Sequence, residues 1–175
     1  MKATDVLEHI KDRLGDAVHE AYMQVRKVGV SKRERYHIWV KIDRKKIRDA
    51  VNCLAEIQPY PHLCVISGYD DGDNVVLVYH FVINYETKKE AISVNFSVHL
   101  PKNDLCIDTI TDLIPGALIT EREKIEMLGV DFIGLEDKRR VFLPDDFPEG
   151  VYPWRRDEKG PEKMLHKLYE VGDRE

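Results

Sequence analysis

The side chains that most often bind metals or act as nucleophiles occur in this chain without the spacing that such sites need. Cys53, Cys64 and Cys106 are widely separated and form no CxxC pair, so they give neither a zinc or iron–sulfur signature nor a disulfide framework. The seven histidines show neither HxxxH nor HExxH spacing. Cysteine–histidine catalysis stays open, although no local sequence supports it. We therefore expect free thiols, no catalytic residue, and no metal or cofactor site in this chain.

Charged side chains are concentrated instead between residues 120 and 157. Glu121 and Glu123 lie where the first turn of a helix favours carboxylates, and Arg122 can pair with Glu126 one turn later. Arginines in the irregular chain beyond such a helix usually make two-pronged contacts with carboxylates, within the chain or on a partner. We predict that at least two of them form such pairs. The arginines are Arg139, Arg140, Arg155 and Arg156, and the internal acidic candidates are Asp145, Asp146 and Asp157.

A second charged segment covers residues 32–48 and is basic, with eight Lys and Arg side chains against two acidic ones. Two interpretations stay open. The segment is either a solvated face whose counter-charges lie elsewhere in the fold, or a docking patch for an acidic neighbour or an anionic lipid surface. The first interpretation needs no partner and is the simpler one. The basic side chains are Lys32, Arg33, Arg35, Lys41, Arg44, Lys45, Lys46 and Arg48.

The elements that position these residues begin with a helix, a strand pair and a second helix. Thr4 can cap the first helix, and Gly15 is placed to end it. Residues 19–28 are predicted to form a strand, and residues 35–42 alternate between apolar and polar side chains as a half-buried strand does. Asp43 can cap the second helix. The apolar stripe of this helix is Ile47, Val51, Leu54 and Ala55.

Three strand patterns follow, over residues 62–67, 75–84 and 92–100. The segments 69–74 and 86–89 between them are rich in turn-forming residues. The last strand alternates most regularly, with Ile, Val, Phe, Val and Leu on one face and Ser, Asn, Ser and His on the other. This order predicts an antiparallel meander with one face exposed to water.

Helical signals return in the C-terminal part of the chain. Asp108 can begin a short helix that the Pro-Gly pair at 115–116 stops. Thr120 and Glu123 have the spacing of a capping box for a last helix, which Gly129 would end. Beyond residue 130 there is little periodicity, and long irregular segments often lie on a partner.

The predicted fold is therefore α+β. We expect a single domain over residues 1–130, with a mostly antiparallel sheet flanked by helices. We expect residues 131–175 to form an extended C-terminal arm that packs on a partner subunit. A length of 175 residues suits this organisation, because domains of 100–200 residues can build a hydrophobic core of their own.

Composition narrows the class of protein. The chain is 34% charged, with a formal net charge of −5 and a pI near 5.8. The acidic balance argues against a nucleic-acid-binding domain, and the high charge content is typical of thermophilic proteins. The longest apolar stretch, residues 75–83, is interrupted by His80 and is far shorter than the ~20 residues that span a bilayer. Because the N-terminal residues carry charges and no signal-peptide core, we expect a cytoplasmic protein without a membrane span.

Residues 107–157 strongly resemble the 30-kDa subunit family of complex I, the respiratory NADH dehydrogenase. The family pattern is a Glu-Arg-Glu helix start, a further acidic residue, a Gly-hydrophobic turn and a Phe-x-Gly step. An Arg-Arg pair, an acidic pair and a Pro-x-Arg-basic-Asp ending complete it. The matching residues are Glu121, Arg122, Glu123, Glu126, Gly129, Phe132, Gly134, Arg139, Arg140, Asp145, Asp146, Pro153, Arg155, Arg156 and Asp157.

Two departures from that pattern favour one branch of the family. Ile119 stands where members from respiratory complex I commonly have Trp, and Leu135-Glu136 follow Gly134 where those members have His-Pro. The branch that this favours contains the small subunits of membrane-bound nickel–iron hydrogenases and sulfane reductases. The alternative is the 30-kDa subunit of a complex I that oxidises NADH, reduces quinone or oxidises another cofactor.

The resemblance implies a non-catalytic accessory subunit in the peripheral arm of a multisubunit membrane complex. Such a subunit carries no redox centre and packs on the large hydrogenase-like (49-kDa-type) subunit, near the small iron–sulfur subunit. The iron–sulfur clusters, and nickel–iron in a hydrogenase, would lie in those partners. Partner subunits would hold the chain peripherally on the cytoplasmic side of the cell membrane. The motif residues would then shape or line the interface.

Overall fold

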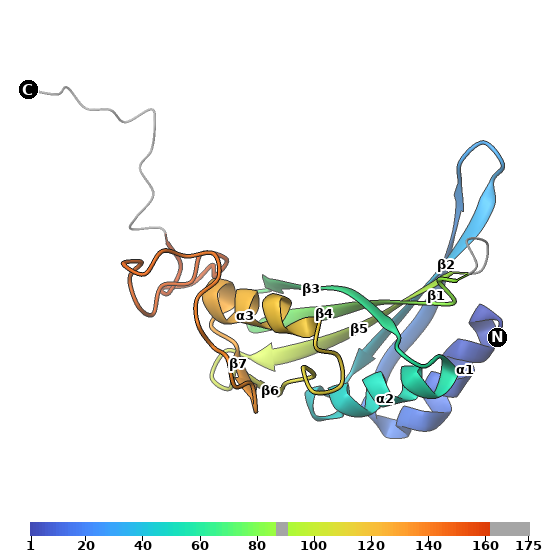
Figure 1. The fold of residues 1–175 in the computed structure, drawn as a ribbon, viewed down its shortest axis with the longest axis horizontal. Helices are drawn as coiled ribbons and strands as arrows, with labels where there is room; N and C mark the ends of the chain where they lie inside the picture. The colour runs from blue at the N-terminus through green and yellow to red at the C-terminus, as the bar shows by residue number, and fades with distance from the viewer. Residues whose placement is uncertain (87–90, 162–175) are drawn as a thin grey trace, which may run out of the picture.

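The computed structural model describes residues 1–86 and 91–161 of the chain (Figure 1). Three α-helices and seven strands make up this part, with two short 3-10 turns. The helical elements are α1 (Ala3–Leu14), η1 (Gly15–Ala17), η2 (Arg44–Lys46), α2 (Ile47–Ile57) and α3 (Ala117–Leu128). The strands are β1 (Val18–Val28), β2 (Arg33–Ile42), β3 (His62–Asp70), β4 (Asn74–Ile83), β5 (Ile92–Pro101), β6 (Cys106–Asp108) and β7 (Asp131–Ile133).

Five strands form one sheet in the order β1-β2-β5-β4-β3, and β6 pairs with β7 in a second, two-stranded sheet. The β3-β4-β5 meander is antiparallel, as predicted, and β1 pairs antiparallel with β2. The β2–β5 pair is parallel, with Tyr36 opposite Ile92. This pairing is possible because α2, β3 and β4 separate the two strands in sequence. The α+β prediction and the mostly antiparallel sheet are confirmed.

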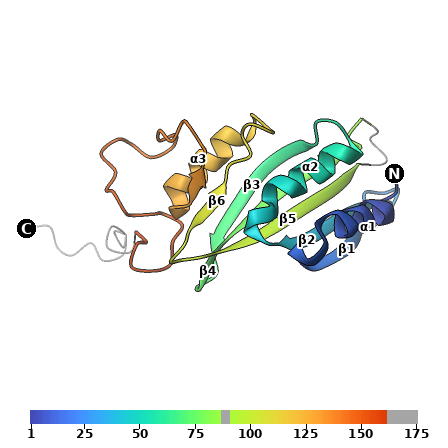
Figure 2. The same ribbon diagram turned by 90° about the horizontal axis from the view of Figure 1, so that it is seen from below.

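The hydrophobic core lies between one face of the large sheet and the helices (Figure 2). The odd-numbered side chains of β4, from Val75 to Ile83, belong to this core together with Val6 and Ile10 of α1 and Leu54 of α2. The opposite face of the sheet is the predicted exposed one, but it is not fully wet. Asn95 on that face is buried, because its amide bonds to groups on both neighbouring strands.

Two predicted details of the N-terminal helices are wrong. The first helix begins after Lys2 rather than Thr4, and Asp5 accepts a hydrogen bond from the Lys2 backbone nitrogen. Ala55 is exposed, because Ala50 and Cys53 join the buried stripe of α2 instead. The end of α1 at Gly15 and the cap by Asp43 are confirmed, although Asp43 caps η2, which leads directly into α2.

Two predicted helix starts in the C-terminal part are also wrong. Asp108 ends the strand β6, and the residues between it and α3 form turns rather than a helix. Thr120 does not cap α3, because the helix already begins at Ala117, whose carbonyl oxygen accepts from the Thr120 hydroxyl. The predicted end at Gly129 is confirmed.

The C-terminal arm is described as far as residue 161, and the rest of it lies outside the described residues. Its first residues form β7 and pair with β6, and Phe132 is fully buried. The division into a domain over 1–130 and an arm over 131–175, and packing of that arm on a partner, stay predictions. Within the described ranges, no helix is both long and apolar enough to cross a membrane.

Candidate docking site around helix α3

The helix α3 lies on β3 and buries charged side chains against it. Gly68 of β3 makes the close approach possible, since a Cβ at this position would lie 2.7 Å from Cδ1 of Leu128. Glu121, Lys124 and Glu126 are all less than a tenth exposed. Buried charges are strongly unfavourable unless they are paired or hydrogen-bonded, so each of the three must have partners.

Glu121 ties α3 to the loop that follows β6. Its carboxylate accepts hydrogen bonds from the Thr109 hydroxyl (2.5 Å) and the Ile110 backbone nitrogen (2.9 Å). Burial raises the pKa of Glu121, and these two hydrogen bonds oppose the rise. The first Glu of the family motif therefore has an internal role.

Glu126 ties α3 to the C-terminal arm. Its carboxylate accepts hydrogen bonds from three successive backbone nitrogens, those of Val141, Phe142 (2.9 Å) and Leu143 (3.0 Å). Hydrogen bonds to an ionised acceptor are about twice as strong as neutral ones. One carboxylate thus fixes three residues of a segment that has no regular secondary structure.

Arg122 holds the same segment from the other side. Its guanidinium donates to the carbonyl oxygens of Arg139 (2.7 Å) and Arg140 (3.0 Å) and lies 3.3 Å from Asp137. The predicted pair between Arg122 and Glu126 is therefore wrong, because both side chains bind the arm instead. Glu123, the last member of the Glu-Arg-Glu start, pairs with Lys124.

The four arginines of the arm differ in their contacts. Arg139 makes the predicted two-pronged pair, with Nε and Nη2 each 2.8 Å from an oxygen of Asp137, and it is exposed. Arg140 instead donates to the carbonyl oxygens of Pro144 (2.7 Å) and Phe147 (3.0 Å) and so closes a turn of the arm. Asp145 also contributes its carbonyl oxygen to Arg140 (3.2 Å), and Asp146 is exposed.

Arg155 belongs to a nearly buried charge cluster that sequence reasoning missed. Its Nε and Nη2 both contact Oδ2 of Asp157. Lys102 Nζ lies 2.8 Å from Asp70 and 3.0 Å from Asp157, and the Arg156 backbone nitrogen donates to Asp70 (2.8 Å). Asp157 is thus the partner of Arg155, as predicted, but both nitrogens contact one carboxylate oxygen rather than one oxygen each. Asp70 and Lys102 carry no signal in the sequence, because they come close to the arm only when β3 and β5 pair with β4.

This cluster controls the ionisation of its acidic members. Burial alone would raise the pKa of Asp157, but hydrogen bonds from Arg155, Lys102 and the Lys159 backbone lower it to about 2. The pKa of Asp70 is also lowered, because bonds from Arg156 and Lys102 outweigh its burial. Both carboxylates therefore stay ionised and hold the arm at neutral pH.

Gly129 and Trp154 complete the contact between α3 and the arm. Gly129 has φ 76°, and a Cβ there would lie 2.6 Å from the Tyr152 ring, so both the backbone and the close approach require glycine. The Trp154 backbone nitrogen donates to the Met127 carbonyl oxygen (3.0 Å). The centroid of the Trp154 ring lies 4.7 Å from Nζ of Lys124, which is a cation–π contact. Pro153, between Tyr152 and Trp154, is half-buried.

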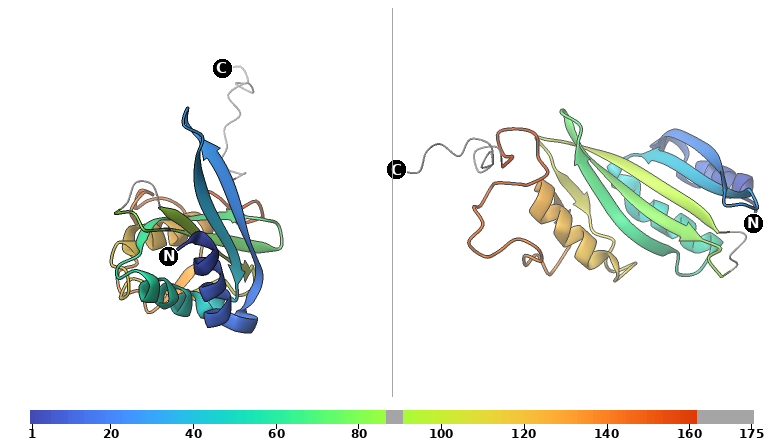
Figure 3. Two further views of the ribbon diagram at one scale, coloured as in Figure 1. Left: turned by 90° about the vertical axis from the view of Figure 1, so that its right-hand side faces the viewer. Right: turned by 90° about the horizontal axis from the view of Figure 1, so that it is seen from above.

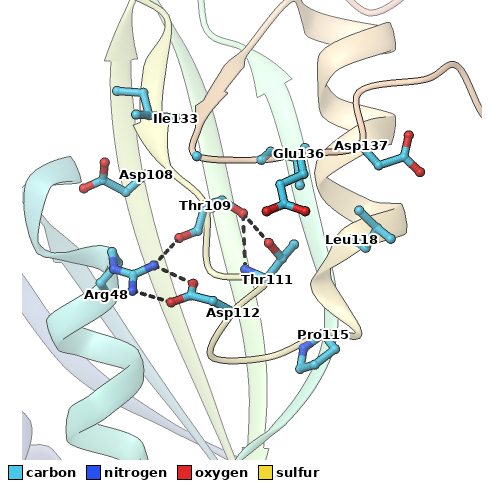
Figure 4. Close-up of a pocket in the computed structure, with 12 residues that line it drawn as sticks. Arg48, Asp108, Thr109, Thr111, Asp112, Pro115, Leu118, Ile133, Glu136 and Asp137 are labelled. Atoms are coloured by element: carbon cyan, nitrogen blue, oxygen red, sulfur yellow. Dashed lines mark hydrogen bonds and ion pairs between the residues drawn. The ribbon is translucent and has the colours of Figure 1, made fainter.

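An open hollow of about 690 Å³ lies beside the start of α3 (Figure 4). Arg48 of α2 lines one side of it, with a two-pronged pair to Asp112 (2.7 and 2.6 Å) and a bond to the Thr109 carbonyl oxygen (2.7 Å). Gly134 borders the hollow with φ 85°. The apolar members of the lining are Pro115, Leu118, Ile133 and Leu135, and the acidic ones are Asp108, Asp112, Glu136 and Asp137.

Large apolar side chains remain exposed around this region although the charges are paired internally. Phe142, whose backbone nitrogen is held by Glu126, is 56% exposed, and Trp154, whose ring contacts Lys124, is 41% exposed. Ile119 on α3, Ile133 on β7 and Val141 are also exposed. Exposed apolar side chains near polar groups are typical of a protein–protein interface. We call these five side chains the α3 face.

The opposite face of the sheet holds a Ser-His-Asn chain that the sequence did not indicate. The Ser67 hydroxyl lies 2.7 Å from Nε2 of His80, whose Nδ1 lies 2.7 Å from the Asn95 amide oxygen. Such a chain could activate a serine, but an acyl-transfer site also needs N–H donors aimed at the reacting oxygen. Here the three residues lie on adjacent strands, whose N–H groups lie in the plane of the sheet. These hydrogen bonds fix the three side chains on the sheet surface.

No group of three or more His, Cys, Asp or Glu side chains is arranged to hold a metal ion in the described ranges. The three cysteines are free thiols, as expected. Cys53 is buried, and this burial raises its pKa to about 11, which makes it a poor nucleophile at neutral pH.

Comparison with known proteins identifies relatives over nearly the whole chain. It is 39% identical to the membrane-bound hydrogenase subunit beta of Pyrococcus furiosus, over 94% of this chain and 91% of that protein. It is 26% identical to a subunit of the F(420)H(2) dehydrogenase of Methanosarcina mazei, over 96% of this chain and 99% of that protein. Its fold matches a chain in the structure of the membrane-bound sulfane sulfur reductase, an archaeal respiratory membrane complex. That match has a TM-score of 0.65 and 21% identity, and covers 95% of this chain and 86% of the other.

A family match covers the strands β3, β4 and β5 and the α3 region. Residues 40–164 match the family described as "Respiratory-chain NADH dehydrogenase, 30 Kd subunit". This range includes every motif residue whose contacts are described above, and it takes in more than half of the chain. The protein therefore belongs to the 30 Kd subunit family of the respiratory-chain NADH dehydrogenase.

Proposed function

We propose that this protein is a non-catalytic accessory subunit of a membrane-bound hydrogenase or sulfane reductase related to complex I. It docks on the large hydrogenase-like subunit of the peripheral arm, next to the small iron–sulfur subunit, and stabilises that assembly. These partners hold the iron–sulfur and nickel–iron centres and keep the chain on the cytoplasmic side of the membrane. The 39% identity to a membrane-bound hydrogenase subunit over almost the full length of both chains supports this host.

The observation that carries the proposal is the α3 face. Arg122, Glu126 and Arg155 direct their charges inward and fix the arm on the domain. This arrangement leaves Phe142 and the other four apolar side chains of the face turned to solvent. A fixed apolar surface needs less ordering on association than a flexible segment does, so it is suited to a permanent interface.

Co-expression with the hydrogenase-like large subunit of the same host tests the docking. We expect the wild-type chain to form a complex on a native gel, and Phe142→Ala with Trp154→Ala to weaken it at least tenfold. Buried aromatic residues at interfaces commonly contribute about 2 kcal/mol or more, which supports this magnitude. Tyr60→Ala is the matched control, because Tyr60 is 87% exposed and lies outside the α3 face. Docking through this face would be contradicted if the control lost as much of the complex as the double variant, or if the double variant lost none.

The alternative host is a complex I in which this chain is the 30-kDa subunit. The relation to the F(420)H(2) dehydrogenase subunit of Methanosarcina mazei favours it, since that match covers 99% of the relative. The sequence of the large subunit from the same host distinguishes the two kinds of complex. Two intact CxxC nickel-binding motifs in it mean a hydrogenase, and loss of some of those cysteines means a sulfane reductase or a complex I.

A further inference from the structure

The hairpin made by β1 and β2 projects from the body of the protein (Figures 1 and 3). The two strands pair with each other over their full length, from Val18–Ile42 to Val28–Arg33. The parallel partner of β2, however, reaches only as far as Tyr36. Residues 25–35 therefore form a two-stranded ribbon that, in the part of the chain that the structure describes, pairs with no third strand.

A ribbon of this kind is marginally stable in water, and this one exposes apolar side chains on both faces. Val25 is 45% exposed and Val28 is 42% exposed. They point to opposite faces, because side chains alternate along a strand and these two are three residues apart. Val30 at the tip is fully exposed. Isolated hairpins need a third strand or a packed surface for stability, so these features indicate a partner surface on both sides of the ribbon.

The charge of the ribbon indicates what that surface carries. Residues 25–35 contain five basic side chains and one acidic side chain, Glu34, whose carboxylate accepts a hydrogen bond from the Tyr36 hydroxyl (2.8 Å). In the rest of the basic segment, Arg44 pairs with Asp104 and Arg48 with Asp112. The two interpretations of the basic segment, a face with counter-charges in the fold and a docking patch, thus apply to different parts of it. Arg44, Lys46 and Arg48 find counter-charges within the fold. The ribbon exposes four of its five basic side chains, those of Arg26, Lys27, Lys32 and Arg33.

We propose that the β1–β2 ribbon inserts into a groove on a neighbouring protein subunit, with apolar surfaces on both walls for Val25 and Val28 and at its end for Val30, and with Asp or Glu on its rim. Three of the five basic residues are arginines, whose planar guanidinium suits bidentate contact with carboxylates. A membrane-inserting tip would carry aromatic or long apolar side chains, whereas this tip carries Val30 between glycine and serine. The proposal rests on the proposed function, because it requires an assembly with more than one contact surface.

Photo-crosslinking in the assembled complex tests the location of the ribbon. A benzophenone amino acid is placed at Val28 or Val30 in the full chain, and at Tyr60 as the exposed control, and crosslinked peptides are identified by mass spectrometry. We expect both ribbon positions to crosslink to one segment of a partner subunit that is rich in Asp and Glu. Crosslinks confined to this chain or to lipid, in a complex that still contains the chain, would overturn the inference and leave the proposed function intact.

Charge reversal tests the chemistry of the contact. We expect Arg26→Glu with Arg33→Glu to weaken association with the complex at least tenfold in low salt, and expect Lys11→Glu on the exposed side of α1 to change it less than twofold. Binding of the wild-type chain to vesicles of equal phosphatidylcholine and phosphatidylglycerol, lost in the double variant, would overturn the inference in favour of a lipid surface. Ribbon crosslinks to an acidic protein groove without association with a hydrogenase-like large subunit would instead contradict the proposed function and support the ribbon assignment.

Discussion

Replacing Glu126 with Gln is expected to release the arm from α3 without unfolding the domain. The carboxylate accepts three backbone N–H bonds, from Val141, Phe142 and Leu143, in a site where it is 7% exposed. A glutamine side chain keeps one oxygen, loses the charge, and presents an NH2 donor to an N–H donor. The fold of the sheet should persist, because Glu126 belongs to α3 and its bonds reach only the arm.

The magnitude follows from those three bonds. Hydrogen bonds to a charged acceptor contribute about 1.5–3 kcal/mol each, and losses within one cluster are not additive. We therefore expect local opening of the arm to become easier by about 2–4 kcal/mol. At about 1.4 kcal/mol per factor of ten, this raises the open population by about 30- to 700-fold.

Amide hydrogen exchange at residues 141–143 measures this opening directly, because exchange at these positions requires the bonds to Glu126 to break. Glu149→Gln is the matched control, since it removes the same charge from an exposed position of the same segment. We expect fast exchange at 141–143 in Glu126→Gln and unchanged exchange in the control. Exchange within threefold of the wild type in Glu126→Gln would refute the reasoning.

Three further predictions concern the same region. Gly129→Ala should lower the free energy of unfolding by at least about 1–2 kcal/mol in thermal denaturation, because alanine is strained at φ 76° and its Cβ would meet Tyr152; an unchanged Tm would contradict this. Glu121→Ala should lower the free energy of unfolding by about 1–3 kcal/mol in urea denaturation, because it leaves the buried donors of Thr109 and Ile110 unpaired. A decrease of less than about 0.5 kcal/mol would count against the buried contact. The pKa of Asp157 is lowered to about 2 in the folded chain, below its ordinary value. Its ionised form therefore adds about 2 kcal/mol to the free energy of unfolding above pH 4, and this contribution is lost as the pH falls toward 2. Trp154 fluorescence should report the release of the arm over that range, and a transition centred above pH 5 would exclude Asp157 as its cause.

Local patterns in the sequence predict most of the elements of the fold. The alternation in residues 35–42 and 92–100 gives the strands β2 and β5 because one side of each must face the core. The parallel pairing of these two strands has no local signature, since it depends on contacts between residues more than fifty positions apart. The predicted start of α3 is wrong for a related reason. Thr120 and Glu123 have the spacing of a capping box, but the preceding residues continue the helix back to Ala117, and the Thr120 hydroxyl donates to the Ala117 carbonyl oxygen instead.

The sequence directs attention to several residues of the α3 region but not to the contacts that they make. The resemblance and the density of charge selected Glu126, Arg139 and Arg155, and all three contact the arm or lie in it. Their partners include backbone groups and Asp70 of β3, which only the folded chain brings together. Sequence alone does not divide the basic segment 32–48 into paired and projecting parts, because that division depends on how far the hairpin extends beyond the sheet.

Hydrogen exchange of the full chain, alone and bound to the hydrogenase-like large subunit of its host, tests docking through the α3 face most directly. We predict that binding slows exchange at least tenfold in peptides around Ile133, Phe142 and Trp154, with no change in the exposed residues of β3. Formation of a stable complex without slower exchange at these positions, or failure of the wild-type chain to form one, would contradict the account.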